Sequence, residues 1–301
     1  MLQRPGFPGT ERPVGPDIQA VRIFMSGTLF VVATPLGNLD DFSPRAVRTL
    51  NQVDLIACED TRHSAKLLRH FGIRTATISY HEHNEEERSR QLIGRLEEGM
   101  EIALISDAGT PLLSDPGFRL VRKCRRHGLP IIPIPGPTAV AAALSVSGLP
   151  TDRFFFAGFL PKRLSGAASR LEALSRLDAT LVFFLSPHRL TDTLSQLLDG
   201  LGNRKAFLIR EMTKLYEASY SGTLREILRT LEDEPVSGEY TLVVEGGSVP
   251  TASAPLDVVA YVFGLEEMRG LTRKEAIKRA ARDLALPKRQ IYRMVVEEGE
   301  A

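Results

Sequence analysis

Short apolar runs alternate with longer segments of mixed polarity along most of this chain. The runs have the length of buried strands, and apolar residues recur at helical spacing in the segments between them. We expect a first set of strands at 29–33, 53–58, 77–80, 102–105 and 130–134, and a second set at 154–159, 180–185, 206–210 and 240–245. Apolar strands that alternate with helices predict an α/β fold with a mostly parallel sheet covered on both faces.

Residues that favour helix ends lie between the expected strands. Ser43-Pro44 opens a helix, and Asp60 is a candidate N-cap for a helix that ends near Phe71. A charged helix is expected over 85–98. We also predict that Asp115 caps a helix whose first residue is Pro116, because proline is favoured at that position.

Changes in composition divide the chain into five parts. The first residues are rich in proline and poor in apolar side chains, Gly148–Asp152 resembles a boundary, and Thr272 and Glu275 match a capping box near the end. We expect a disordered tail (1–25, with Met25 as the functional start), an N-terminal α/β domain (26–149), a C-terminal α/β domain (150–247), a linker (248–257) and a basic helical extension (258–301).

Composition excludes several classes of protein. The chain has 301 residues and a net charge of +1, so any basic surface must be local. Two cysteines, Cys58 and Cys124, cannot form a disulfide framework or a zinc site, and we interpret them as buried thiols in a reducing compartment. No apolar run approaches the roughly 20 residues of a membrane span. We therefore expect a cytoplasmic protein without a membrane partner.

The loop over 106–117 is the strongest functional signal. It follows an apolar strand, and its sequence SDAGTPLLSDPG is longer and richer in turn residues than a plain connection. Open α/β sheets bind ligands at the carboxyl ends of their strands. Gly109 allows close approach of a ligand to the backbone, and Pro111 fixes the turn. We interpret this segment as a binding loop.

Other loops follow strands in the same way. Thr34–Asn38 should lie on the same sheet edge as the binding loop, yet the chain has no G-x-G-x-x-G after the first strand and no phosphate loop, which removes the usual support for NAD and ATP. The segments 59–62, 186–189 and 210–214 either line the same cleft or serve as caps and surface. His81 and His83 lack an evident third ligand, so we expect a hydrogen-bonded loop and no metal.

Basic residues form two local clusters. Nine Lys/Arg and two Asp/Glu lie between Arg269 and Arg293, which gives this segment a charge of +7. The helix expected over 118–127 adds five more cations. A charged run is usually a solvated helix face, but two such patches on a neutral protein also fit binding of a phosphate backbone.

Seven segments in order resemble the tetrapyrrole methylase superfamily, and within it the branch that 2'-O-methylates a cytidine of 16S ribosomal RNA. The segments are 31–39, 54–62, 105–117, 133–139, 148–154, 158–161 and 210–214. One departure concerns Leu185, because the family usually has an acid before Ser-x-His-Arg. The resemblance implies two α/β domains with the cofactor cleft between them, a small helical C-terminal extension and a homodimer.

The resemblance also implies S-adenosylmethionine as cofactor and 16S rRNA or the small ribosomal subunit as partner. Its cofactor contacts would fall on Pro35, Ala108, Gly109, Thr110, Leu113, Thr138, Ala139, Leu185 and Gly222. Candidates that could accept the proton of a ribose hydroxyl are Glu59, Asp60, Asp107, Glu211 and Lys214. Candidate RNA contacts are Arg62, Arg189, Arg273, Lys274, Lys288 and Arg289.

Two other functions stay open at this point. The chain could methylate a tetrapyrrole or another small substrate, such as a modified protein side chain, which the basic extension disfavours. It could also be a non-catalytic RNA-binding module, which the intact glycine and proline loops disfavour.

Overall fold

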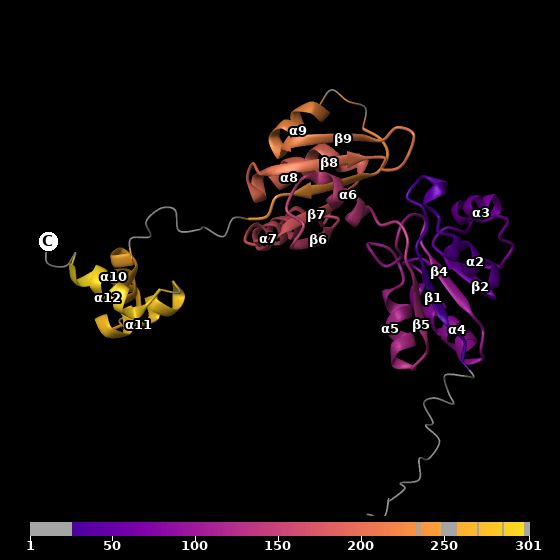
Figure 1. Cartoon of the computed structure of the whole chain (residues 1–301), viewed down its shortest axis with the longest axis horizontal. Coiled ribbons are helices and arrows are strands. Elements are labelled where there is room, and N and C mark those ends of the chain that lie inside the picture. The colour runs from indigo at the N-terminus through magenta and orange to yellow at the C-terminus, as the bar shows by residue number, and fades with distance from the viewer. Residues whose placement is uncertain are drawn as a thin grey trace, which may run out of the picture. The chain divides into compact units, whose positions relative to one another are not determined.

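A computed structural model describes residues 26–232, 234, 236–247, 258–269, 271–284 and 286–297 (Figure 1). The predicted disordered tail (1–25) and linker (248–257) lie outside the described residues. The chain divides into two compact units, one up to Gly247 and one from Ser248 onward. Each unit is described by itself.

The first sheet of the larger unit has five strands in the order β3-β2-β4-β1-β5, and all its pairings are parallel. Its strands are β1 (Leu29–Val32), β2 (Leu55–Cys58), β3 (Thr77–Ser79), β4 (Ile102–Ile105) and β5 (Ile131–Ile134). Helices α2 (Pro44–Gln52) and α3 (Thr61–His70) share one apolar cluster with the sheet, whereas α4 (Glu85–Glu97) and α5 (Phe118–Arg126) share another. This arrangement confirms the predicted parallel sheet with helices on both faces.

Local sequence explains where the helices on one face begin. The Ser43 hydroxyl accepts a hydrogen bond from the Ala46 N–H at 3.1 Å, and Asp60 accepts from the Arg62 N–H at 2.8 Å. Both residues therefore act as the N-caps that the sequence predicts.

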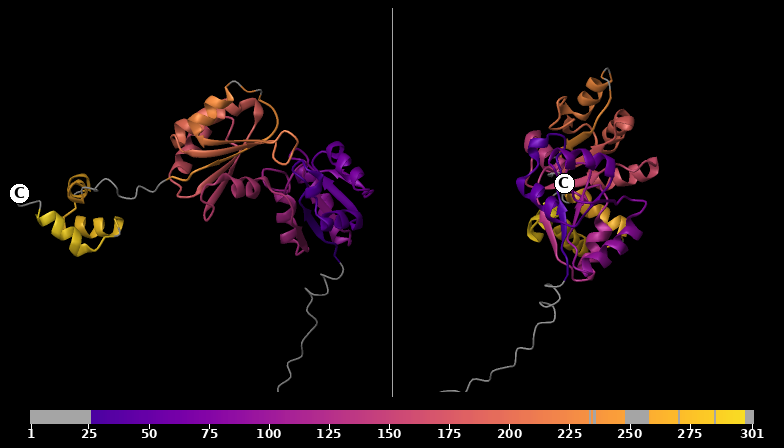
Figure 2. Two further views of the ribbon diagram at one scale, coloured as in Figure 1. Left: turned by 45° about the horizontal axis from the view of Figure 1, so that its top comes forward. Right: turned by 90° about the vertical axis from the view of Figure 1, so that its right-hand side faces the viewer.

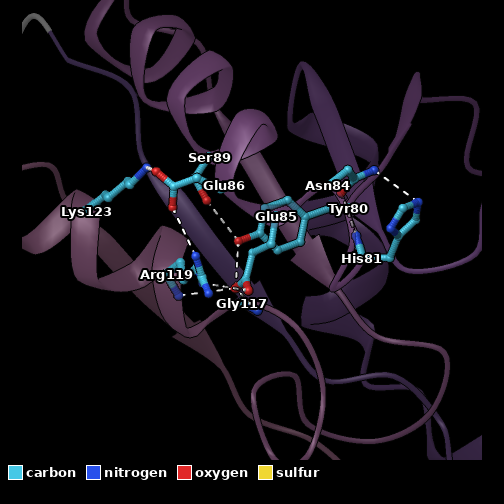
Figure 3. Close-up of polar contacts among 9 residues, drawn as sticks. All are labelled: Tyr80, His81, Asn84, Glu85, Glu86, Ser89, Gly117, Arg119 and Lys123. Atoms are coloured by element: carbon cyan, nitrogen blue, oxygen red, sulfur yellow. Dashed lines mark hydrogen bonds and ion pairs between the residues drawn. The ribbon is translucent and has the colours of Figure 1, made fainter.

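The predicted start of α5 is wrong. Asp115 is not its N-cap and Pro116 is not its first residue, because Gly117 takes the cap position with φ +137° and the helix begins at Phe118. The Glu85 carboxylate of α4 accepts hydrogen bonds from the N–H groups of Gly117 at 3.1 Å and Arg119 at 3.3 Å (Figure 3). An acceptor from another helix thus replaces the local cap.

The second sheet also has five strands, in the order β6-β7-β10-β8-β9. Only β6 pairs with β7 in parallel, and the other pairings are antiparallel. The strands are β6 (Phe154–Gly158), β7 (Thr180–Leu185), β8 (Lys205–Arg210), β9 (Ala218–Thr223) and β10 (Tyr240–Val244). The sequence pattern did not predict β9, an edge strand whose sequence ASYSGT lacks an apolar run.

Helices cover both faces of the second sheet. Leucines of α7 (Leu164–Ser175), α8 (Leu190–Leu201) and α9 (Leu224–Leu231) pack into one apolar cluster with it. On the other face lies α6 (Ala139–Ser147), through Val140, Ala143 and Leu144. Helix α6 precedes residue 150 in the chain but packs on this second sheet.

The smaller unit contains α10 (Val258–Arg269), α11 (Arg273–Asp283) and α12 (Lys288–Glu297), the yellow helices of Figures 1 and 2. Val262, Ile277 and Ile291 are buried where the three helices meet. The predicted capping box of Thr272 and Glu275 is present at the start of α11.

Candidate active site

Three loops meet at the carboxyl ends of β1, β4 and β5. Thr34 and Gly109 form a two-way backbone bridge, with N–H to O distances of 2.8 and 3.1 Å. The buried Thr34 hydroxyl donates to the Ser106 carbonyl at 3.1 Å, and the Thr110 hydroxyl donates to the Pro137 carbonyl at 3.0 Å. The loop after β1 therefore shares the sheet edge of the binding loop, as the sequence predicts.

This edge contains the topological switch point of the first sheet, where the helices after two neighbouring strands pack on opposite faces. Strands β1 and β4 are neighbours, but the helices that follow them, α2 and α5, pack on opposite faces. Open α/β sheets bind ligands at such a point, outside the carboxyl ends of the strands.

A cavity of about 340 Å³ opens at this edge of the sheet, large enough for a small organic ligand. Its walls come from the loops after β1, β4, β5 and β6, from the end of β7 and from the beginning of β10. The lining residues are Leu36, Asp107, Ala108, Gly109, Thr110, Leu113, Ser114, Asp115, Thr138, Ala139, Phe159, Phe184, Leu185, Ser186, Pro187, Glu239, Tyr240 and Thr241.

The binding loop has an unusual backbone. Gly109 has φ +79°, while Leu112 and Ser114 reach φ values of +75° and +72° without being glycine. Such conformations are costly for residues with a Cβ and cluster at ligand sites. Ser114 also approaches the second sheet, since a Cβ on Gly158 would lie 3.1 Å from its hydroxyl oxygen.

Carboxylates gather beside the cavity. The Asp60 N–H donates to Asp107 at 3.3 Å, which brings the loop after β2 against the binding loop. Burial, together with repulsion from Asp115 and Asp107, raises the pKa of Glu59 to about 7. Burial, with repulsion from Asp107 and Glu239, raises the pKa of Asp115 to about 6 despite a hydrogen bond from Ser106.

Asp60 differs from its neighbours because it caps α3. The N–H of Arg62 is the main reason that the pKa of Asp60 is lowered, and the N–H of His63 adds to it. The Arg62 side chain is 93% exposed and lies 3.7 Å from the Asp60 carboxylate. Asp60 thus keeps its charge as a helix cap.

Lys214 connects the loop after β8 to the cavity wall. Its ammonium group lies 2.9 Å from Glu211 and 3.1 Å from Glu239, which lines the cavity. Burial alone would lower the pKa of Lys214, but the two carboxylates hold it above its usual value. In the same loop, the Thr213 hydroxyl accepts a hydrogen bond from the Asn38 N–H at 3.1 Å.

The structure brings most of the predicted cofactor contacts together. Seven of them line the cavity, namely Ala108, Gly109, Thr110, Leu113, Thr138, Ala139 and Leu185. Among the described lining residues, Pro35 and Gly222 are not found. Pro35 directly precedes Leu36, whereas Gly222 lies opposite Ala206, at the end of the second sheet remote from Tyr240.

The residues proposed for other roles are more scattered. Asp107 lines the cavity, and Glu59, Asp60, Glu211 and Lys214 lie near its edge. Arg189 ends the short helix η2 (Pro187–Arg189), which directly follows the lining residue Ser186. Lys274, Lys288 and Arg289 are exposed in the smaller unit. Arg273 contacts Glu266 and the Phe263 ring in the same unit.

Several lining residues escaped the sequence interpretation. Phe184 belongs to a strand that the sequence does predict, but no motif marked it as a ligand contact. Asp115 lies in the predicted binding loop, and Ser186 lies in a segment that the sequence assigned either to the cleft or to caps and surface; both line the cavity. Tyr240 and Thr241 begin β10, and Glu239 directly precedes it. They reach the cavity because β10 runs antiparallel to β7, an arrangement that no motif in the chain indicates.

The two histidines of the loop after β3 lie beside each other, with ring centroids 6.0 Å apart, and Asn84 contacts the His81 ring at 3.1 Å. Within the described residues, no group of three or more His, Cys, Asp or Glu side chains is arranged to hold a metal ion. In the same part of the chain, no helix has the length and hydrophobicity needed to cross a bilayer.

Residues 28–228 match the sequence profile of the Tetrapyrrole (Corrin/Porphyrin) Methylases. The chain belongs to the tetrapyrrole methylase family. It is 46% identical over 280 residues to the Ribosomal RNA small subunit methyltransferase I of Halalkalibacterium halodurans, covering 90% of this chain and 96% of that protein. The protein of the same name from Pseudomonas aeruginosa is 44% identical over 275 residues, covering 90% and 98%.

Two solved structures share the fold. The uroporphyrin-III-C-methyltransferase of Thermus thermophilus superposes with a TM-score of 0.54 at 22% identity, covering 73% of this chain and 94% of that one. A diphthine synthase superposes with a TM-score of 0.57 at 17% identity, covering 73% and 90%. The two-sheet architecture of this chain is therefore that of the tetrapyrrole methylases, with a helical C-terminal unit in addition.

Proposed function

We propose that this chain transfers a methyl group from S-adenosylmethionine to the 2'-hydroxyl of a cytidine ribose in 16S ribosomal RNA. The observation that carries the proposal is the cavity at the switch point of the first sheet, in a chain whose relatives over 90% of its length are named ribosomal RNA small subunit methyltransferases. We propose the cavity as the site of the methyl donor.

The chemistry of the cavity fits this cofactor. Leu36, Phe159 and Phe184 offer apolar surface to an adenine ring. Asp107 and Asp115 provide negative charge for the cationic end of the ligand. When bound, S-adenosylmethionine supplies an activated methyl group. The protein's part is to hold the acceptor hydroxyl in line with it and to exclude water.

Among the five candidate proton acceptors, the surroundings favour Glu59. A pKa of about 7 suits a group that must be ionised and still basic near neutral pH. Lys214 is held protonated by Glu211 and Glu239, and the ion pair with Lys214 also engages Glu211. Asp60 is engaged as a helix cap. We therefore propose Glu59 as the base, with Asp107 beside it at the cavity wall.

Cations at the surface support an RNA substrate; of those near the cavity, Arg62 is exposed and Arg189 is half-buried. Arg62 lies beside the loop that carries Glu59, and Arg189 follows the cavity wall at Ser186. We propose that both contact RNA together with four residues of the smaller unit, which we term the tail cations. The tail cations are Arg273, Lys274, Lys288 and Arg289.

We also propose a homodimer located in the cytoplasm. Val146 of α6 is 58% exposed, and Phe154 and Phe155 of the edge strand β6 are 51% and 43% exposed. Exposed apolar side chains that gather in one patch mark interaction sites. A second copy of the chain could cover them. The cytoplasmic location follows from the proposed ribosomal substrate. Sedimentation of the parent and of a Phe154→Glu variant tests the dimer, which the variant should dissociate.

The substrate class is tested with methyl-labelled S-adenosylmethionine and three acceptors. These are small ribosomal subunits lacking the modification, free 16S RNA and a tetrapyrrole precursor. We expect label in RNA, either in the assembled subunit or in the free form, and none in the tetrapyrrole. Label in the tetrapyrrole alone would identify the chain as a small-molecule methylase. Donor binding without transfer to any acceptor would count against the proposed reaction.

A further inference from the structure

Helix α5 carries an unusual concentration of positive charge. Its sequence FRLVRKCRR contains five cations and no acidic residue. Leu120 and Cys124 are fully buried in the core, so the side of the helix opposite them faces outward. The cations therefore form part of the surface of the larger unit.

The cations of α5 fall into two groups. Arg119 and Lys123 pair with Glu86 of α4 at 3.3 and 2.8 Å (Figure 3). Arg122, Arg125 and Arg126 are exposed and form no ion pair with any acidic residue that the structure describes. The charge of this second group is therefore available to an external anion.

An exposed aromatic ring stands among the second group. Phe118 is 63% exposed, and the guanidinium carbon of Arg122 lies 6.0 Å from the centre of its ring. Residues 118, 122 and 125 recur at helical spacing and so lie on one side of α5, opposite Leu120. We term Phe118, Arg122, Arg125 and Arg126 the α5 cationic face.

The α5 cationic face begins close to the cavity. Phe118 is separated from the cavity-lining Asp115 by only Pro116 and Gly117, so their Cα atoms are at most about 11 Å apart. A strand that followed the axis of α5 toward its N-terminus would thus arrive at the cavity edge.

We propose that the α5 cationic face binds the RNA strand that enters the cavity, with the three arginines on backbone phosphates and Phe118 stacked on a nucleobase. This proposal rests on the proposed RNA methylation. The chemistry fits a single-stranded segment, since such sites combine a cationic track with an aromatic platform. A lipid surface fits less well, because the apolar side of α5 is already buried in the core.

The test compares two variants that each lose three positive charges. One is Arg122→Gln/Arg125→Gln/Arg126→Gln. The matched control is Arg45→Gln/Arg48→Gln/Arg69→Gln, which removes exposed arginines from α2 and α3 on the opposite face of the same sheet. A Phe118→Ala variant tests the aromatic ring separately. Each protein is measured for binding to a small-subunit RNA fragment at several salt concentrations, for binding to S-adenosylmethionine and for sedimentation.

We expect the α5 triple variant to bind RNA about ten-fold more weakly at moderate salt, with a salt dependence flatter by about 2 in log–log slope. Phe118→Ala should weaken RNA binding by about ten-fold without flattening the slope. Cofactor affinity should stay at the parental value in all three. The control should retain RNA affinity and slope.

RNA affinity and slope equal to those of the control would overturn the proposal, as would a change confined to the sedimentation of the α5 variants. The binding assay keeps this outcome distinct from a failure of the proposed function. If the parent binds RNA through this face yet transfers no methyl group, the proposed reaction is wrong but the proposed RNA-binding surface is correct.

Discussion

Glu85 should stabilise the larger unit far more than its neighbour Glu86, because it replaces the missing cap of α5. Glu85 is 8% exposed, and one of its carboxylate oxygens accepts from the N–H groups of Gly117 and Arg119 and from the Tyr80 hydroxyl at 3.1–3.3 Å. Glu85→Ala leaves the buried Gly117 N–H without its acceptor, which costs about 1–3 kcal/mol. Loss of the negative charge at the helix N-terminus adds about 0.3–1 kcal/mol.

The expected total for Glu85→Ala is therefore about 1–4 kcal/mol of unfolding free energy. Tyr80 adds little to this figure because its hydroxyl keeps Ser89 as a partner at 3.0 Å. Glu85→Gln retains an acceptor oxygen and should cost about 1 kcal/mol. Because Gly117 ends the binding loop, Glu85→Ala should also weaken binding of S-adenosylmethionine.

Urea unfolding at pH 7, followed by circular dichroism, measures these differences. Glu86→Gln is the matched control, since this residue makes three ion pairs on the surface at 51% side-chain exposure. Exposed pairs contribute about 0–1 kcal/mol, so the control should stay within that range. Equal losses for Glu85→Ala and Glu86→Gln would refute the capping account of α5.

Three further predictions concern the cavity and the tail. Gly109→Val should abolish binding of the methyl donor, measured by calorimetry, while the protein still folds. The reason is that Gly109 has φ +79° and a Cβ there would lie 3.0 Å from Leu36. Donor affinity equal to that of the parent would show that the loop is misassigned. Burial raises the pKa of Glu59 from 4.5 to about 7 in the folded protein, so between these two pH values the folded state binds more protons than the unfolded chain. The free energy of unfolding therefore falls as the pH rises from 4.5 to about 7. Glu59→Gln should make the melting temperature depend less on pH in this range, and an unchanged pH dependence would contradict the burial argument. If Glu59 is the base, the same variant should also transfer methyl groups more slowly. Changing all four tail cations to glutamine should weaken RNA binding and its salt dependence while cofactor affinity holds, and a change in sedimentation alone would instead assign the tail to self-association.

The sequence pattern predicted the first sheet well because residues close together in the chain determine its strands and most of its helix ends. Buried parallel strands are apolar throughout, and caps such as Ser43 and Asp60 act within their own helices. The start of α5 was mispredicted because its acceptor, Glu85, lies 32 residues earlier in the chain. Rules based on neighbouring residues do not detect such a partner.

The second sheet and its share of the cavity were harder to predict. Strand β9 is half exposed and polar, so it lacks the apolar run that marks a buried strand. Glu239 and Tyr240 reach the cavity only because β10 is antiparallel to its neighbours, which brings the beginning of this strand to the carboxyl end of β7. By contrast, the turn residues of the binding loop, including Gly109, are visible in the sequence itself.

The position of the transferred methyl group tests the account most directly. Small subunits lacking the modification are incubated with methyl-labelled S-adenosylmethionine, and the purified 16S RNA is hydrolysed in alkali. Alkaline cleavage needs a free 2'-hydroxyl, so methylation of the ribose leaves the label in an alkali-resistant dinucleotide that begins with cytidine. We predict that product for the parent and its absence for Gly109→Val. Label released in a mononucleotide would place the methyl group on a base and contradict the proposed ribose methylation.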